Sequence, residues 1–205
     1  MTQTPRPRDP VAAQVQTVAN TVLASLQSRL PHGVDRHLPA ALRRNTPPDD
    51  PALWLTLDLS SLHPHGDGLD APTYVRAATA TTAAAQLWAR TGIVHRKSSA
   101  DRHNSLGALA ARLARTRPAT ERDFARILRS HTLDEVLPRL RSLLHQGRNE
   151  TLSLDYALLA CDFYALQSPG GSLTVGQRWA HAFTQAKART RRTTPLPAHG
   201  KADPA

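Results

Sequence analysis

Apolar residues recur at intervals of three and four positions along most of this chain, the spacing at which side chains share one face of an α-helix. The pattern is clearest in residues 120–144, TERDFARILRSHTLDEVLPRLRSLL. At about 100° of rotation per residue, its first half separates into an apolar side and a basic side: Phe124, Ile127 and Leu128 against Arg122, Arg126 and Arg129. We therefore predict a helix that packs through its apolar residues and carries a row of arginines on the opposite side.

A second helix is predicted directly after the first. Thr132 is a suitable N-cap, and Glu135 three residues later completes the pattern of a capping box. The helix that follows presents Arg139 and Arg141 beside its apolar leucines. Pro138 lies inside this helix and should kink it or delay its regular part, because proline has no backbone N–H to donate.

Capping residues and prolines at first helical positions mark the remaining helices. They are expected from Pro10 to about Leu30, in a short segment led by Pro39, after Pro51, from about Pro72 to Arg90, after Asn104 or Ser105, after Ser153, and in a last segment with Val175, Trp179 and Phe183. No convincing strand or internal repeat is present. The pattern thus predicts an all-α fold, a compact bundle of roughly eight or nine helices.

Charge makes this helical chain a candidate polyanion-binding protein. Twenty-six Lys and Arg against 16 Asp and Glu give a formal net charge of +10 and a pI of about 11.1. From residue 102 to residue 148 all ten basic residues are arginines, against four acids, and arginine suits bidentate contacts to phosphate better than lysine does. Solvated basic helix faces are common, but this surplus of arginine favours a nucleic-acid partner, with an anionic membrane surface as the less favoured alternative.

The domain organisation follows from where the helical pattern stops. Residues 1–8 are polar and predict a disordered lead, and residues 191–205 predict a disordered basic tail. Between them we expect one helical nucleic-acid-binding domain over residues 9–190, with a division into two helical subdomains near residues 91–103 as the alternative. That connector contains Arg96, Lys97 and Arg102 and is expected to be a mobile basic loop.

Scarce aromatic residues limit the kind of nucleic-acid contact. They make up 4% of the chain and occupy internal-looking helix positions, whereas stacking on bases needs exposed aromatic rings. Contacts are therefore expected mainly with the phosphate backbone. Neither a secretory signal pattern nor an apolar run of about 18 residues is seen, so no membrane association is expected, and the single Cys161 fits a reducing cytoplasm.

One loop resembles a metal-binding motif. His63, His65 and Asp67 match the HxHxD part of the motif of metallo-β-lactamase-like hydrolases, and these residue types can hold zinc. Gly68 stands where that motif has a further histidine, and no strand precedes it. We therefore expect solvated loop histidines rather than a metal site. No catalytic residue or cofactor site is predicted, because no Walker, GxGxxG, GxSxG or CxxC motif is present, and Cys161 reads as a buried hydrophobe.

A second functional class is a free-standing DNA-binding regulator, with residues 124–144 as a helix-turn-helix. The connector between the two helices is short enough for that motif. However, the arginines lie on the first helix as much as on the second, and helix-turn-helix proteins concentrate their base contacts on the second helix.

Several local patterns, in one order, resemble the small subunit of the type I-E CRISPR Cascade complex, the CasB family. The segments that carry the resemblance are AALRR at 40–44, NSLGALAARLA at 104–114, ERDFARILRS at 121–130, LPRLRSLL at 137–144, LDYALLACDFY at 154–164 and GQRWAHAF at 176–183. Each segment is weak alone, but together they extend across most of residues 11–186. The acidic loop around Gly66 and the C-terminal tail have no counterpart in the family pattern.

The resemblance implies a non-enzymatic, cytoplasmic, mostly helical subunit of an RNA-guided DNA surveillance complex. Its implied partners are CRISPR RNA, the target and non-target DNA strands, the other Cascade subunits and a second copy of itself. Its implied role is to hold the strands and stabilise the R-loop. The candidate contact residues, from the motifs and from the basic connector, are Arg43, Arg44, Arg96, Lys97, Arg102, Arg122, Arg126, Arg129, Arg139 and Arg141. For Arg43 and Arg44, capping of their own helix end is an equally good interpretation.

Overall fold

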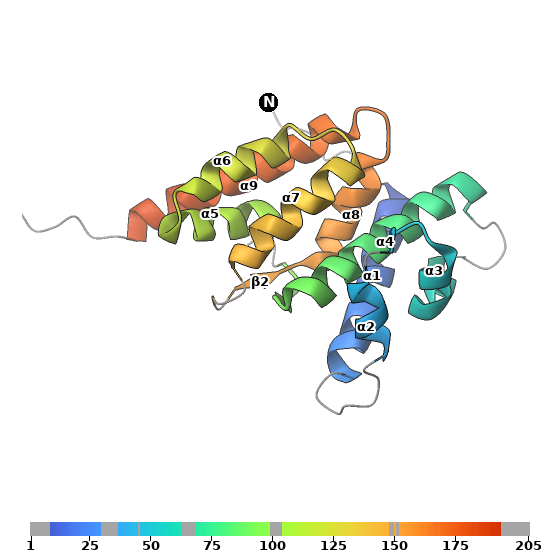
Figure 1. The fold of residues 1–205 in the computed structure, drawn as a ribbon. Helices are drawn as coiled ribbons and strands as arrows, with labels where there is room; N and C mark the ends of the chain where they lie inside the picture. The colour runs from blue at the N-terminus through green and yellow to red at the C-terminus, as the bar shows by residue number, and fades with distance from the viewer. Residues whose placement is uncertain are drawn as a thin grey trace, which may run out of the picture.

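The computed structural model describes residues 9–29, 37–44, 46–62, 69–98, 104–147, 150 and 152–193. Within these ranges the elements are α1 (Pro10–Arg29), α2 (His37–Arg43), α3 (Pro51–Leu57), the 3-10 helix η1 (Leu59–Leu62), α4 (Ala71–Thr91), β1 (Val94–His95), α5 (Leu106–Thr116), α6 (Ala119–Leu128), α7 (Leu133–Gln146), β2 (Ser153–Leu154), α8 (Tyr156–Leu166) and α9 (Gly171–Thr193). The prediction of an all-α bundle with eight or nine helices is confirmed (Figure 1).

Several helix starts follow the local sequence because a side-chain oxygen before the helix accepts a hydrogen bond from a free backbone N–H. Asp50 accepts from the N–H of Ala52 at 2.9 Å, and Asp70 from that of Thr73 at 3.2 Å. Ser105, rather than Asn104, caps α5. These caps fix where the predicted helices begin.

The core is organised around α8, which packs against α1, α4 and α9. Figure 1 shows α5, α6 and α9 side by side on one side of the molecule and α1 to α4 on the other, with α7 and α8 between them. Phe163 of α8 and Val15 of α1 are completely buried, and Leu87 of α4 is 1% exposed. One cluster of buried side chains extends from Val15 to Trp179.

Two short strands were not predicted. Val94 and His95 pair in parallel with Ser153 and Leu154, so part of the expected mobile loop is held against the core, and the side chain of His95 is 9% exposed. The predicted cap at Ser153 is wrong for the same reason. Ser153 lies in β2, and Asp155 caps α8 by accepting from the N–H of Leu158 at 2.9 Å.

Two helices differ in extent or regularity from the prediction. α7 is continuous from Leu133 to Gln146 and contains Pro138, which is exposed, so the regular part of the helix is not delayed. α9 continues to Thr193 and so includes the first three residues of the tail expected over residues 191–205. The lead, the HPHGDG loop and the rest of the tail lie outside the described residues.

Candidate nucleic-acid interface

The arginine row on α6 has the geometry predicted from the sequence. Phe124 and Ile127 are 2% and 1% exposed and face the core, while the side chains on the opposite side of the helix are solvent-exposed. They include Arg122 and Arg126, and the third predicted arginine, Arg129, is exposed at the C-cap directly after the last residue of α6. Arg122 and Arg129 form no ion pair or side-chain hydrogen bond with any residue that the structure describes. Their guanidinium groups are therefore available to an external anion.

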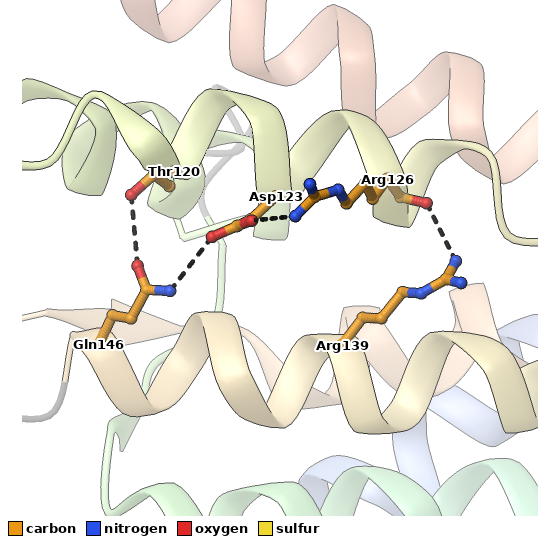
Figure 2. A network of polar contacts seen from close by, with 5 residues as sticks. All are labelled: Thr120, Asp123, Arg126, Arg139 and Gln146. Carbon is orange, nitrogen blue, oxygen red and sulfur yellow. Dashed lines mark hydrogen bonds and ion pairs between the residues drawn. The ribbon is translucent and has the colours of Figure 1, made fainter.

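The third arginine of the row belongs to a polar network between α6 and α7 (Figure 2). The Nη1 atom of Arg126 lies 3.0 Å from Oδ1 of Asp123. The other oxygen of Asp123 accepts from Nε2 of Gln146 on α7 at 3.4 Å, and Thr120 donates to Oε1 of Gln146 at 3.5 Å. This network sets the register of the two helices at their exposed edge.

Arg139 contributes to the same helix pair from α7. Its Nη1 atom donates to the backbone oxygen of Arg126 at 3.3 Å and to Oγ of Ser130 at 2.5 Å. The last carbonyls of a helix have no partner inside the helix, so a cation at this place satisfies the end of α6 and its dipole. Arg139 thus contacts the C-terminal end of α6, and its side chain is exposed.

The turn between α6 and α7 is closed by the predicted capping residues. Thr132 accepts from the N–H of Glu135 at 3.3 Å, and Glu135 accepts from the N–H of His131 at 2.9 Å. In a regular capping box the glutamate would bond the N–H of the N-cap residue itself. Here Glu135 bonds the N–H of the preceding residue, His131, so Thr132 and Glu135 together hold the connector between α6 and α7.

A second basic group forms where α2 ends against α4. Arg43 donates from Nε to the backbone oxygen of Ala89 at 2.9 Å, and Arg90 donates from Nε to that of Leu42 at 3.4 Å. Arg90 also donates to the backbone oxygen of Arg44. Each helix therefore satisfies the terminal carbonyls of the other. For Arg43 this supports the capping interpretation, in a form that crosses between helices, while the side chain of Arg44 is exposed.

Arg141 extends this group from α7, which packs against α4. Its side chain is half-buried, and burial lowers the pKa of Arg141 from its ordinary value. Burial, and then the positive charge of Arg141, lower the pKa of Arg90. Arg90 was not among the predicted site residues. Its position in the last turn of α4 could have indicated a role at the helix end. Its proximity to Arg141, however, depends on the packing of α7.

Arg96 and Lys97 lie in the middle of the connector and are both exposed. The backbone around them is fixed from three sides. The N–H of Arg96 donates to the oxygen of Leu154 at 3.1 Å, that of Ser98 to Oδ2 of Asp155 at 2.6 Å, and Asn104 donates to the oxygen of Lys97 at 3.1 Å. These two cations are presented on ordered backbone, whereas Arg102 lies outside the described residues.

The sequence matches the model of the CRISPR-associated protein Cse2 family over residues 39–183, most of the chain. The chain belongs to the Cse2 family. The predicted resemblance to a type I-E Cascade small subunit is confirmed, and members of this family are structural subunits of that complex.

Solved structures agree with this family at the level of the fold. The crystal structure of CasB from Thermobifida fusca is 22% identical, covers 84% of this chain and 97% of its own, and superposes with a TM-score of 0.65. The structure of CasB from M. ruber is 20% identical, covers 78% of this chain and 91% of its own, and has a TM-score of 0.58. No curated protein matches the sequence.

None of the nine aromatic side chains of this Cse2-family chain is exposed, and all nine lie in described residues. Trp88, Phe124 and Trp179 are 5% exposed or less. Trp54 and Tyr74 are half-buried and pack edge to face, with ring centroids 5.9 Å apart. The described surface thus offers guanidinium groups but no exposed Trp, Tyr or Phe ring on which a base could stack.

Neither metal binding nor thiol chemistry finds support in the described part of the chain. No group of three or more His, Cys, Asp or Glu in the described residues is arranged to hold a metal ion. His63, His65 and Asp67, which we expected not to form a metal site, lie outside the described residues. Cys161 donates to the oxygen of Ala12 at 3.1 Å, and burial raises the pKa of its thiol to about 12. Among the described helices, none is both long and apolar enough to span a membrane.

Proposed function

We propose that this Cascade subunit binds CRISPR RNA and the opened target DNA through contacts to their phosphate backbones, and that it thereby stabilises the R-loop without catalysing a reaction. The observation that carries the proposal is the exposed row of arginines on α6, in which Arg122 and Arg129 have no ionic partner among the described residues. An unpaired guanidinium pair on a rigid helix can contact phosphates at little cost in side-chain ordering.

Small contributions matter for this function because R-loop formation is nearly balanced in free energy. The RNA–DNA hybrid that forms is about as stable as the DNA duplex that it replaces. A few phosphate contacts to the hybrid or to the displaced strand can therefore shift the equilibrium towards the open state. Such contacts carry no base preference, so sequence selection would rest with the guide RNA.

Seven of the ten candidate residues divide into two roles in this proposal. Arg44, Arg96, Lys97, Arg122 and Arg129 are exposed and are proposed to contact strands directly. Arg43 and Arg139 hold helix ends and are proposed to act by positioning the others. The two copies implied by the family would place two such surfaces along the bound strands.

The test is target binding by reconstituted Cascade that contains this chain with Arg122→Ala and Arg129→Ala together. We expect the dissociation constant for target DNA to rise roughly tenfold, and the slope of log affinity against log salt concentration to fall by about 1.4, since each single-strand phosphate contact contributes about 0.7. Two unrelated guide and target pairs should show the same loss.

A matched control removes the same net charge elsewhere. Ala52→Glu and Thr56→Glu on α3 alter two exposed residues in a region of the chain rich in aspartate, and we expect little change in target binding. An equal loss of target binding in the control would show that the effect arises from net charge alone, and would contradict the proposal. A loss that depends strongly on the target sequence would instead favour a base-reading regulator.

A further inference from the structure

A carboxylate lies within the arginine side of α6. Asp123 is the only acid between Arg122 and Arg129, and its Oδ1 atom is 3.0 Å from the guanidinium of Arg126. The side chain of Asp123 is 36% exposed and that of Arg126 is 69% exposed. The pair therefore stands at the surface where a phosphate would approach.

The position of Asp123 is set from a second helix. Its Oδ2 atom accepts from Gln146 of α7 at 3.4 Å, and the other end of the same amide accepts from Thr120 at 3.5 Å (Figure 2). Figure 2 shows the carboxylate lying between Gln146 and Arg126. Because α7 orients it, the carboxylate is held against Arg126 rather than left to sample solvent.

A phosphate and Asp123 would compete for Arg126. Both are oxyanions that accept charge-assisted hydrogen bonds from guanidinium N–H groups. An exposed ion pair changes an equilibrium constant by no more than about fivefold, so a strand phosphate can displace Asp123. The displacement nevertheless reduces the net gain from the contact.

We propose that Asp123 is an internal competitor that occupies Arg126 in the free chain and so sets the affinity of the arginine row for nucleic acid. This inference rests on the proposed function and concerns the same surface. In the free chain only Arg122 and Arg129 of the row would be open to stray strands, so the row would bind them weakly. In the assembled complex a strand is held beside the row at high effective concentration, and Arg126 exchanges Asp123 for a phosphate.

The experiment compares two isosteric variants that each remove one negative charge. Asp123→Asn frees Arg126, and its amide oxygen can still accept from Gln146. Asp134→Asn, the control, alters an exposed acid in the first turn of α7. Binding of the purified full-length chain to labelled mixed-sequence 20-nucleotide RNA and DNA strands is measured across a salt series, after melting curves have shown that both variants fold as the parent does.

We expect Asp123→Asn to bind each strand about two- to fivefold more tightly and to steepen the salt slope by about 0.7, the contribution of one further phosphate contact. Asp134→Asn should give a smaller gain with an unchanged slope. In chain that also carries Arg126→Ala, the Asp123→Asn change should have no further effect beyond that of the control.

Two results would overturn the inference: equal gains in both variants, or a gain from Asp123→Asn that persists without Arg126. These results differ from a failure of the proposed function. If Arg122→Ala with Arg129→Ala weakens binding while Asp123→Asn behaves as the control, only the competitor role is lost. If neither strand binds the parent chain even at low salt, and Cascade tolerates loss of both arginines, the proposed function and this inference fail together.

Discussion

Gly107 of α5 faces the backbone oxygen of Trp179 of α9 so closely that no side chain fits between them. A Cβ atom at Gly107 would overlap that oxygen and would lie 2.8 Å from the amide nitrogen of Phe183 and 2.9 Å from the Cβ of Ala182. The backbones of α5 and α9 are thus in contact at this point. α6, which carries the arginine row, packs against both of these helices.

Gly107→Ala should destabilise the chain by about 3 kcal/mol, because the neighbours are backbone atoms that cannot rotate away. The gain of about 1 kcal/mol in helix propensity would offset only part of this cost. Denaturant unfolding followed by far-UV circular dichroism measures the change. Gly176→Ala in α9 is the matched control, since its Cβ would meet only the oxygen of Leu128 at 3.4 Å. A Gly107→Ala chain as stable as the Gly176→Ala chain would show that α5 and α9 can separate freely.

Arg43→Ala should lower the stability of the chain, whereas Arg44→Ala should weaken strand binding and leave stability nearly unchanged. The first removes the donor to the oxygen of Ala89 and should cost about 1 kcal/mol in the free energy of unfolding. The second removes an exposed side chain and should leave stability within about 0.5 kcal/mol while weakening strand binding. Thermal unfolding and a salt-dependent binding assay on both variants check this. Equal loss of stability in both would contradict the division of roles.

His95 should make stability depend on pH. Its Nδ1 atom accepts from the N–H of Tyr156 at 3.2 Å, and burial lowers the pKa of His95 below 6.5, against the opposing influence of Asp155 and with a smaller contribution from Lys97. The unfolded chain therefore binds a proton on His95 more readily than the folded chain does. The stability that depends on neutral His95 is fully present above about pH 6.5 and is lost as the pH falls through the folded pKa, at up to about 1.4 kcal/mol per pH unit. His95→Gln should remove this part of the pH dependence, whereas His145→Gln, at an exposed position, should retain it.

Cys161 should react slowly with thiol reagents in the folded chain. Burial first, and then the charge of Asp162, raise the pKa of its thiol to about 12, and the thiolate is the reactive form. At pH 8 we expect alkylation to be more than about a hundredfold slower than in chain unfolded by denaturant. Rapid labelling of the folded chain by iodoacetamide, at a rate near that of free cysteine, would be incompatible with the packing of α8 against α1.

The sequence predicted those features that depend on residues close together in the chain. The cap at Thr132 and the exposed row on α6 follow from helix geometry alone, because caps and faces are set within a few residues. The two strands were missed since two residues each are too few to show a period of two, and their pairing joins distant segments.

The fate of individual arginines could not be predicted, because it depends on tertiary neighbours. Arg122 and Arg139 are both exposed arginines on predicted helices, yet only Arg139 donates to the end of α6. Arg90 came close to Arg141 only through the packing of α4 and α7. A basic residue on a predicted helix can therefore be assigned to the surface from sequence, but not to a binding role.

The short parallel pair of β1 and β2 has a consequence for how the chain matures on the ribosome. Arg96 and Lys97 take their place only when the backbone beside them bonds to Leu154 and Asp155, which are made after α5, α6 and α7. Contacts between distant segments form late, because a long loop must close first. Until Leu154 and Asp155 have been made, the segment that carries Arg96 and Lys97 lacks these contacts, so it can take its fixed shape only after β2 has been translated.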